Sequence, residues 1–254
     1  MDTIMEKLRN LEKNMDITIL YAVESGSRAW GHYNEDSDFD IRFIYKHNDL
    51  NHYLTINSPT DVIESNDGLY DIVGWDIKKA LKLHYKSNPN LREWILSPIK
   101  YIPMQNDIFE NLPSFDKEVL KHHYYGLTKR HYRKYVKNYE KIDVKLFKKL
   151  LYTIRCILAW TKLNEDILPP MNIDDLINDN NLDKNLEDKI LLLKSAYSKL
   201  DESLISQEDI EYLITWVVDS LEYMEKNLNK PNKDRDIEVY NKRFQQILQE
   251  TNPL

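Results

Sequence analysis

The stretch of sequence that decides the fold reads Glu24-Ser25-Gly26-Ser27-Arg28-Ala29-Trp30-Gly31 and, after a short polar loop, Ser37-Asp38-Phe39-Asp40-Ile41-Arg42. The apolar run 17–23 that precedes it is typical of a buried strand, and 38–45 is predicted as the next strand. A turn of small residues therefore connects two strands. Because alternate side chains of a strand face the same side, Asp38 and Asp40 present their carboxylates together.

Further secondary structure is predicted on both sides of this stretch. Apolar residues at helical spacing predict a helix over 2–14, before the first strand. The pair Asp67-Gly68 favours a tight hairpin between strands over 62–65 and 69–75. The first 75 residues therefore contain most of the strands that we expect in the chain.

The character of the chain changes after Pro103, because helical periodicity replaces the strand signals. We predict an α+β fold, in which a mixed sheet with flanking helices is followed by an all-helical part. The predicted domains are 1–108 and 109–254. The second of them contains helices predicted over 117–140, 144–164, 186–200, 207–227 and 236–250.

Composition narrows the class of protein. The chain has 254 residues, of which 42% are hydrophobic and 30% are charged, as is ordinary for a soluble globular protein. No run of about 18 apolar residues predicts a membrane helix, and the N-terminus lacks the layout of a secretory signal, so a cytoplasmic location is expected. The single cysteine, Cys156, lies in an apolar helical pattern and is interpreted as a core residue.

Charge is distributed unevenly along the chain. The net charge is −7, which by itself argues against a general nucleic-acid-binding protein. Residues 121–155 nevertheless contain eleven Lys or Arg against two acids, which is a net charge of +9. Basic residues interleaved with tyrosines in this segment are suited to a phosphate backbone and to stacking on bases. The alternatives are a solvated charged face and tyrosines that pack between helices.

The paired carboxylates carry the clearest chemical signal. Asp38 and Asp40 repel each other unless a cation lies between them, and carboxylate oxygens are suited to Mg²⁺. Asp71, on a neighbouring predicted strand, supplies a third carboxylate, and three together would hold two metal ions for an in-line displacement at phosphorus. An isolated Asp-x-Asp is more often a solvated strand end. The small-residue turn favours the metal interpretation, because its N–H groups and the Ser27 hydroxyl can cradle phosphate oxygens.

Taken together, these residues resemble the DNA polymerase β nucleotidyltransferase superfamily. More narrowly, residues 17–170 resemble the RlaP-type nucleotidyltransferases, which are associated with RNA ligases. This resemblance implies a polymerase-β-like catalytic domain over 1–108 and a helical domain over 109–254 that completes a cleft for nucleotide and acceptor. It rests on the two strings quoted above and on Asp71-Ile72-Val73-Gly74-Trp75-Asp76, Asn88-Pro89, Glu93-Trp94-Ile95-Leu96-Ser97-Pro98 and Lys149-Leu150-Leu151-Tyr152-x-x-Arg155.

The resemblance also implies roles for single residues. Asp38, Asp40 and Asp71 would bind two Mg²⁺ ions, for which Mn²⁺ is a substitute, and Asp71 would also activate the attacking hydroxyl. For Arg28, the alternative to a phosphate contact is a surface ion pair. The nucleoside triphosphate would be held by Gly26, Ser27, Arg28, Lys149, Tyr152 and Arg155.

The implied reaction transfers a nucleoside monophosphate to an acceptor hydroxyl and releases pyrophosphate. Because of the basic segment 121–155, the leading acceptor is a polynucleotide 3′ end, in particular RNA. The rival acceptors are a protein side chain and a small molecule, and the alternative outside the enzymes is an idle nucleotide- or RNA-binding module. No membrane partner is expected, and the sequence leaves the oligomeric state open. The residues expected to contact the acceptor are Lys129, Arg130, Arg133 and Lys134.

Overall fold

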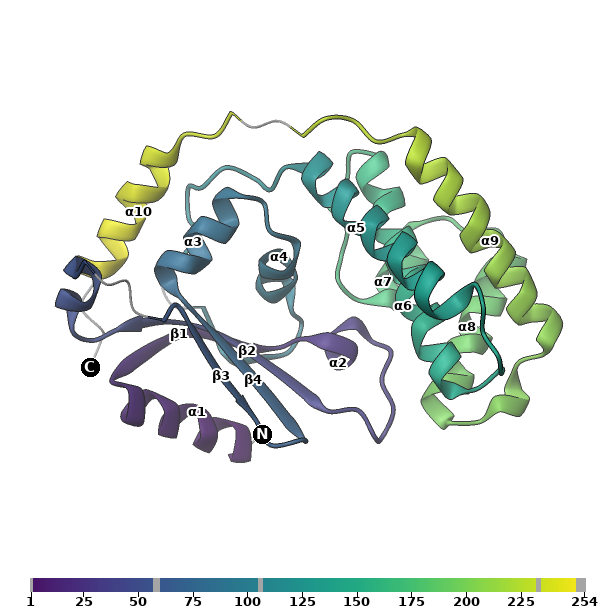
Figure 1. The fold of residues 1–254 in the computed structure, drawn as a ribbon, viewed down its shortest axis with the longest axis horizontal. Helices are drawn as coiled ribbons and strands as arrows, with labels where there is room; N and C mark the ends of the chain where they lie inside the picture. Colours follow the sequence, from purple (N-terminus) through teal and green to yellow (C-terminus); the bar gives the residue numbers. More distant parts are fainter. Residues whose placement is uncertain (1, 57–59, 105–106, 232–233, 250–254) are drawn as a thin grey trace. The chain divides into compact units, whose positions relative to one another are not determined.

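The computed structural model describes residues 2–56, 60–104, 107–231 and 234–249 (Figure 1). These residues form two compact units. The sheet unit contains residues 2–26 and 234–249 and the described part of 38–115, and the helical unit contains residues 27–37 and 116–231. Within the described parts of the chain, every helix is too short or too polar to span a membrane.

The sheet unit is built on a five-stranded sheet with the strand order β3-β4-β2-β1-β5. β2 and β4 are parallel, and the other neighbouring strands are antiparallel. β3 and β4 form the predicted hairpin, in which Gly68 has a φ of +92°. β5 was not predicted, because a three-residue strand carries almost no periodicity. The strands are β1 (Ile17–Glu24), β2 (Phe39–His47), β3 (Val62–Asn66), β4 (Tyr70–Asp76) and β5 (Lys100–Ile102).

Helices cover both faces of this sheet (Figure 1). α1 packs Ile4 and Leu8 against one face, where Phe43 of β2 is also buried. On the other face, Ile77 of α3 and Leu91 of α4 pack against the remaining strand residues. The side chains of Asp76 and Asn88 cap α3 and α4, because each accepts a backbone N–H of the first turn. The three helices are α1 (Asp2–Met15), α3 (Ile77–Tyr85) and α4 (Pro89–Leu96).

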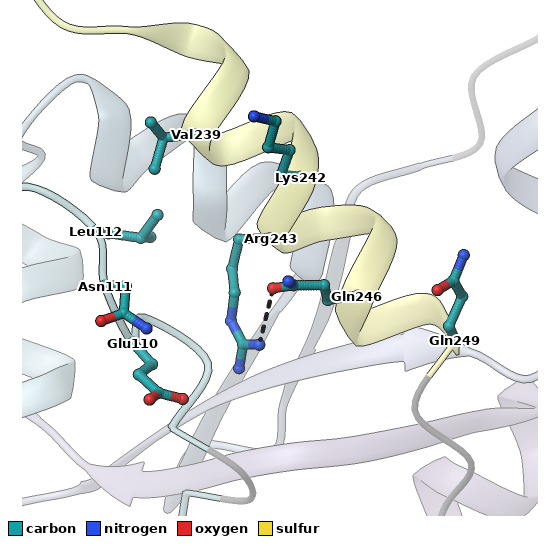
Figure 2. A pocket seen from close by; sticks show the side chains of 8 residues that line it. All are labelled: Glu110, Asn111, Leu112, Val239, Lys242, Arg243, Gln246 and Gln249. Carbon is teal, nitrogen blue, oxygen red and sulfur yellow. Dashed lines mark hydrogen bonds between the residues drawn. The ribbon is translucent and has the colours of Figure 1, made fainter.

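A helix from the end of the chain completes the sheet unit. α10 (Ile237–Gln249) packs Tyr240 and Ile247 into the same apolar core as α3 and α4. Figure 2 shows the side chain of Arg243, which projects from α10. Its Nη1 donates a hydrogen bond to Oε1 of Gln246 at 3.4 Å. The same guanidinium donates to the backbone carbonyls of Asp107 and Ile108, so Arg243 holds α10 to the chain before α5.

The helical unit is organised around one long buried helix, α6, whose residues from Leu150 to Leu163 are mostly inaccessible to solvent. α5 ends at His131 and continues as a π-helix over Tyr132–Val136, whereas an α-helix was predicted as far as residue 140. The π-helix changes which side chains share a face. The helices are α5 (Lys117–His131), α6 (Val144–Asn164), α7 (Ile173–Asp179), α8 (Lys184–Lys199) and α9 (Gln207–Lys226).

The observed architecture is the predicted α+β fold, with the strands in the N-terminal part and a largely helical C-terminal part. The two units nevertheless differ from the predicted domains 1–108 and 109–254. Residues 27–37, which include most of α2 (Gly26–Trp30), belong to the helical unit, and α10 belongs to the sheet unit. These assignments depend on packing between segments far apart in the sequence, which helical periodicity does not reveal.

Candidate active site

Two of the three predicted carboxylates face each other across neighbouring strands. Asp40 of β2 and Asp71 of β4 are partners in the parallel register. Both strands alternate their side chains, and Asp40 and Asp71 lie on the face opposite Ile41 and Ile72, which are buried in the core beside α1. The register of the sheet therefore brings together two acids that are 31 positions apart in the sequence.

A cation joins this pair. Nη2 of Arg42 lies 2.7 Å from Oδ1 of Asp40 and 2.7 Å from Oδ2 of Asp71, and Nη1 donates to the backbone carbonyl of Asp71. The side chains of the two acids are 21% and 31% exposed, so the ion pairs are accessible to water. Both carboxylates are thus directed at a single point, and Arg42 supplies the positive charge there.

Gly26 fits against the same carboxylate. It has a φ of +59°, and a Cβ at this position would lie 1.8 Å from Oδ2 of Asp40. Only glycine combines the positive φ with the missing side chain that this contact requires. The small-residue turn is therefore shaped around Asp40, which is a physical reason for the Gly26 motif that spacing alone could not provide.

The backbone next to Asp40 is also held firmly. Oε1 of Glu24 accepts the N–H of Asp40 at 2.9 Å, and the N–H of Ser25 donates to the carbonyl of Asp40 at 2.7 Å. Tyr101 of β5 donates its hydroxyl to Oε2 of Glu24. Glu24 is 1% exposed, so this buried carboxylate is a fixed support for the strand that carries Asp40.

Asp38 is placed differently from the other two acids. It immediately precedes β2 and its residue is exposed, whereas a strand was predicted to start at this position. Within the described residues, no group of three His, Cys, Asp or Glu side chains is arranged to hold a metal ion. The structure brings together Asp40 and Asp71, and the place of Asp38 in a three-carboxylate site stays a prediction.

The donor set of Asp40 and Asp71 fits one divalent cation. Two carboxylate oxygens already share one positively charged atom at equal distances, and such oxygens are the ligands of Mg²⁺ in phosphoryl-transfer sites. Arg42 and a metal ion would compete for the same oxygens.

Two of the residues predicted to bind nucleotide, Ser27 and Arg28, precede Asp38 in the chain. Ser27 is 5% exposed, and its carbonyl accepts the N–H of His32. Nη2 of Arg28 donates to the carbonyl of Ser37 at 2.7 Å, and its guanidinium lies over the ring of Tyr33. Arg28 therefore binds the polar loop that precedes β2, and its contact with the triphosphate stays a prediction.

In the helical unit, Arg155 is enclosed rather than open to a ligand. It is 1% exposed, and its guanidinium lies 4.4 Å from the ring centre of Trp30 and 5.9 Å from that of Tyr152. Nη1 donates to the carbonyl of Met171. The helix face of Lys148, Lys149, Tyr152 and Arg155 was predicted to be free to bind. Within the unit, α2 and the chain at Met171 cover Arg155, and its role in nucleotide binding stays a prediction.

Tyr152 and Lys149 each contact an aromatic side chain near Arg155 in the helical unit. Tyr152 stacks on His131 at 4.3 Å, and Nζ of Lys149 lies 4.6 Å from the ring centre of Tyr135. Burial, together with Lys149 and two other basic residues, lowers the pKa of His131 to about 4. Burial and nearby cations, Arg155 first among them, lower the pKa of His32 to about 3. Both imidazoles are therefore neutral at physiological pH and act as aromatic packing partners.

The basic residues expected at the acceptor are divided between paired and exposed positions. Nζ of Lys129 forms an ion pair with Oε1 of Glu225 at 2.9 Å and donates a hydrogen bond to the Tyr125 hydroxyl at 2.6 Å. Arg130, Arg133 and Lys134 are exposed, and Lys134 lies over the ring of Tyr135. A pocket of about 600 Å³ in the sheet unit, between residues 110–112 and α10, is lined by none of the predicted site residues.

Sequence reasoning missed Arg42 and Glu24 as parts of this site. Arg42 had a usable signal, because it stands two positions after Asp40 and therefore faces the same side of the strand. Glu24 had none, because a glutamate at the end of an apolar run is usually solvated, and its burial depends on Tyr101 of a strand that was not predicted.

Comparisons with known proteins found similar solved structures, a relative and a family. Two solved structures are similar over most of the chain: the spectinomycin adenyltransferase AAD(9) from Enterococcus faecialis (16% identity, TM-score 0.43, covering 87% of this chain and 97% of that one), and a nucleotidyltransferase-like protein from Exiguobacterium sibiricum 255-15 (11%, 0.36, 98% and 81%). The uncharacterized protein YcgL of Bacillus subtilis (strain 168) is 38% identical over 183 residues, which are 69% of this chain and 68% of YcgL.

A family model places the chain among the nucleotidyltransferases related to DNA polymerase beta. That model describes the RlaP family, the RNA repair pathway DNA polymerase beta family, and it matches residues 1–246. The chain therefore belongs to the RlaP family, as the resemblance of the motifs implied, and it is an enzyme of the nucleotidyltransferase class. The match extends well beyond residue 170, where the recognised motifs end.

Proposed function

We propose that the chain transfers a nucleoside monophosphate from a nucleoside triphosphate to an acceptor hydroxyl. The observation that carries this proposal is the register pair of Asp40 and Asp71, with Gly26 fitted against Asp40, in a member of a polymerase beta family. The acceptor oxygen forms a bond to the α-phosphorus while the bond from that phosphorus to the bridging oxygen of the β-phosphate breaks, and pyrophosphate leaves.

Mg²⁺ would be held by Asp40 and Asp71, with Asp38 as the third predicted ligand. When bound, the ion would supply charge stabilisation for the phosphate oxygens. Arg42 would then give up its ion pairs with the two carboxylates and become available to the negative charge of the triphosphate.

Asp71 is proposed to take the proton of the acceptor hydroxyl. It is the more exposed member of the pair, and one of its oxygens, Oδ1, lies 3.4 Å from the amide nitrogen of Asn66, which leaves that oxygen weakly bonded. Gly26 and Ser27 are proposed to bind the β- and γ-phosphates through backbone N–H groups and the hydroxyl, where charge builds up as pyrophosphate departs.

An RNA 3′ end is the proposed acceptor. The description of the family refers to an RNA repair pathway. Three exposed positive charges, those of Arg130, Arg133 and Lys134, lie close together in the sequence. Such charges would bind the phosphates of a strand. The ion pair between Lys129 and Glu225 reduces the contribution of Lys129.

The test offers each α-labelled nucleoside triphosphate with Mg²⁺ to three acceptors: an RNA with a free 3′ hydroxyl, the same RNA with a 3′ phosphate, and a mixture of proteins. We expect label on the first RNA and none on the blocked one. Label on protein alone would replace the proposed acceptor while keeping the reaction. No transfer from any triphosphate to any acceptor would contradict the proposed reaction.

A further inference from the structure

Two lysines of the helical unit converge on one tyrosine ring. Nζ of Lys134 lies 4.9 Å from the ring centre of Tyr135, and Nζ of Lys149, which comes from α6, lies 4.6 Å from the same centre. The sequence predicts different ligands for the two lysines, the acceptor for Lys134 and the nucleoside triphosphate for Lys149. Their shared position at Tyr135 instead places both ammonium groups at one point of the unit.

No acid compensates this pair of positive charges. Among the described residues, Lys134 and Lys149 have no carboxylate within ion-pair distance, whereas Lys129 of the same basic segment pairs with Glu225 at 2.9 Å. The face of a tyrosine ring attracts an exposed cation much less than a full negative charge does. The two lysines therefore lack a counter-charge, which an anionic ligand would supply.

The titratable side chains beside the pair are influenced by positive charges alone. Burial and three cations, Lys149 first among them, lower the pKa of His131 to about 4. Hydrogen bonding from Lys134, with the charge of Lys149 in addition, lowers the pKa of the Tyr135 hydroxyl. His131 is therefore neutral at physiological pH and supplies no further charge. The Tyr135 hydroxyl becomes a stronger hydrogen-bond donor, which also favours an anion.

The backbone at this point has an unusual conformation. Lys134 and Tyr135 belong to the π-helix over Tyr132–Val136, in which the N–H of Lys137 donates to the carbonyl of Tyr132 at 2.7 Å. Turns of this kind are rare and occur frequently at functional sites. The π-helix is a second reason, independent of charge, to expect a ligand beside Tyr135.

A ligand can reach these side chains from solvent. Lys134 is exposed, and Tyr135 and Lys149 are half-buried. Together they offer two ammonium groups and one hydroxyl, all of which can donate hydrogen bonds. A phosphate group has enough acceptor oxygens for the three donors, and its charge-assisted hydrogen bonds are stronger than those to a neutral group.

We propose that Lys134, Lys149 and the Tyr135 hydroxyl together bind one phosphate group. This site deepens the proposed function and rests on it for the source of the phosphate, which is either the nucleoside triphosphate or the RNA strand. Each ammonium group donates to a phosphate oxygen, and the hydroxyl donates a third hydrogen bond. The phosphate supplies the negative charge that the two lysines lack.

The experiment measures binding without the reaction, so its outcome does not depend on transfer. The full-length protein is titrated by calorimetry with the α,β-methylene analogue of each nucleoside triphosphate, which cannot be cleaved at the α-phosphorus. Separate titrations use a short single-stranded RNA and the same RNA with uncharged methylphosphonate linkages. We expect binding of an analogue, or of the charged RNA only, and the probe that the variants below affect identifies the source of the phosphate.

Three variants each remove one donor at nearly constant shape. Lys134→Gln and Lys149→Gln should each weaken binding by about 10-fold, and Tyr135→Phe by about threefold. Lys145→Gln is the matched control, because Lys145 is an exposed lysine of α6 in the same basic segment. It should weaken binding by less than about twofold, since it removes only a more distant charge. Thermal unfolding shows whether each variant is folded.

A double variant tests whether the two lysines share one phosphate. Side chains that contact the same group are coupled, so Lys134→Gln combined with Lys149→Gln should lose less affinity than the product of the two single losses. A full product would show that the lysines contact different groups, as the sequence predicts, and would overturn the shared site.

Two further results would overturn the proposal. The first is a wild-type protein that binds neither an analogue nor the charged RNA at millimolar concentration. The second is a pair of folded variants, Lys134→Gln and Lys149→Gln, that bind every probe as tightly as Lys145→Gln does. By contrast, probe binding that responds to both lysines in a protein that transfers no label would contradict the proposed reaction and keep this phosphate site.

Discussion

Arg42 of the sheet unit and Arg155 of the helical unit differ in how they are paired and how far they are buried. In the sheet unit, Arg42 lies between two partly exposed carboxylates, which are on neighbouring strands and are reached by water. In the helical unit, Arg155 is 1% exposed and lies over the ring of Trp30, with a backbone carbonyl as its acceptor. Exposed ion pairs exchange partners at little cost, whereas a buried cation loses its whole environment when it moves. Arg42 is therefore suited to respond to ligands, and Arg155 to hold structure.

The largest expected effect concerns the carboxylates that Arg42 joins. Asp40→Asn should lower the transfer rate by at least about 1000-fold, because charge that stabilises the transition state is removed at nearly constant shape. Asp71→Asn should lower the rate as much but keep the affinity for nucleoside triphosphate within about threefold, since its proposed role is proton transfer. Single-turnover rates and nucleotide titrations measure both. Glu64→Gln, on the exposed strand β3, is the control.

If Asp71→Asn loses nucleotide affinity as severely as Asp40→Asn does, the proposed assignment of proton transfer to Asp71 is wrong. Both variants should remain folded, because Arg42 keeps one carboxylate partner in each of them.

The next effect concerns the turn beside Asp40. Gly26→Ala places a Cβ 1.8 Å from the carboxylate at a positive φ, so it should lower transfer by about 100-fold and the free energy of unfolding by about 2 kcal/mol. Gly68→Ala is a matched control, because its φ is also positive but nothing lies within 4 Å of the added atom. It should lose about 1 kcal/mol and keep its activity. Equal loss of activity in both variants would show that backbone strain, and not the contact with Asp40, matters.

A third prediction concerns the buried cation of the helical unit. Arg155→Ala should lower the free energy of unfolding by about 2 kcal/mol, since it removes a desolvated cation–aromatic contact, a hydrogen bond and packed methylenes. Lys149→Ala, on the same helix α6, should change it far less. Urea unfolding measures both. Equal midpoints for Arg155→Ala and the parent protein would contradict a structural role for Arg155.

The smallest expected effect is a dependence of stability on pH in the sheet unit. Burial, followed by the charge of Arg235, lowers the pKa of His84 to about 4, from about 6.5 in the unfolded chain. Between these values the unfolded chain binds more protons, so stability falls as the pH drops below 6.5. From pH 6.5 to 5 the loss from His84 is roughly 1 to 2 kcal/mol.

His84→Phe tests this prediction, because His84 packs among Phe109, Phe115 and Tyr240, where another aromatic ring can be placed. The variant should lose less stability than the parent protein over the same pH range, measured by the urea midpoint. The same change at the exposed His122 is the control. Parallel pH profiles for His84→Phe and the parent would contradict the assignment.

The sequence was most informative where structure is local. Hairpin residues such as Asp67 and Gly68, and caps such as Asp76, act within a few positions, so the strands and most helices of the sheet unit could be predicted. The proximity of Asp40 and Asp71 was also predicted. Two acids on different strands come together when those strands are neighbours in the sheet. The burial of Arg155 could not be predicted, because it depends on Trp30 and Met171, which reach it through packing between distant segments.

The measurement that tests the central claim most directly uses one nucleoside triphosphate labelled separately at the α- and the γ-phosphate. With Mg²⁺ and an RNA that ends in a 3′ hydroxyl, we predict that the α label appears on the RNA and the γ label appears in pyrophosphate in equal amounts. Asp40→Asn should give neither product. Transfer of the γ label to the RNA, or equal transfer of the α label by Asp40→Asn, would contradict nucleotidyl transfer at the pair of Asp40 and Asp71.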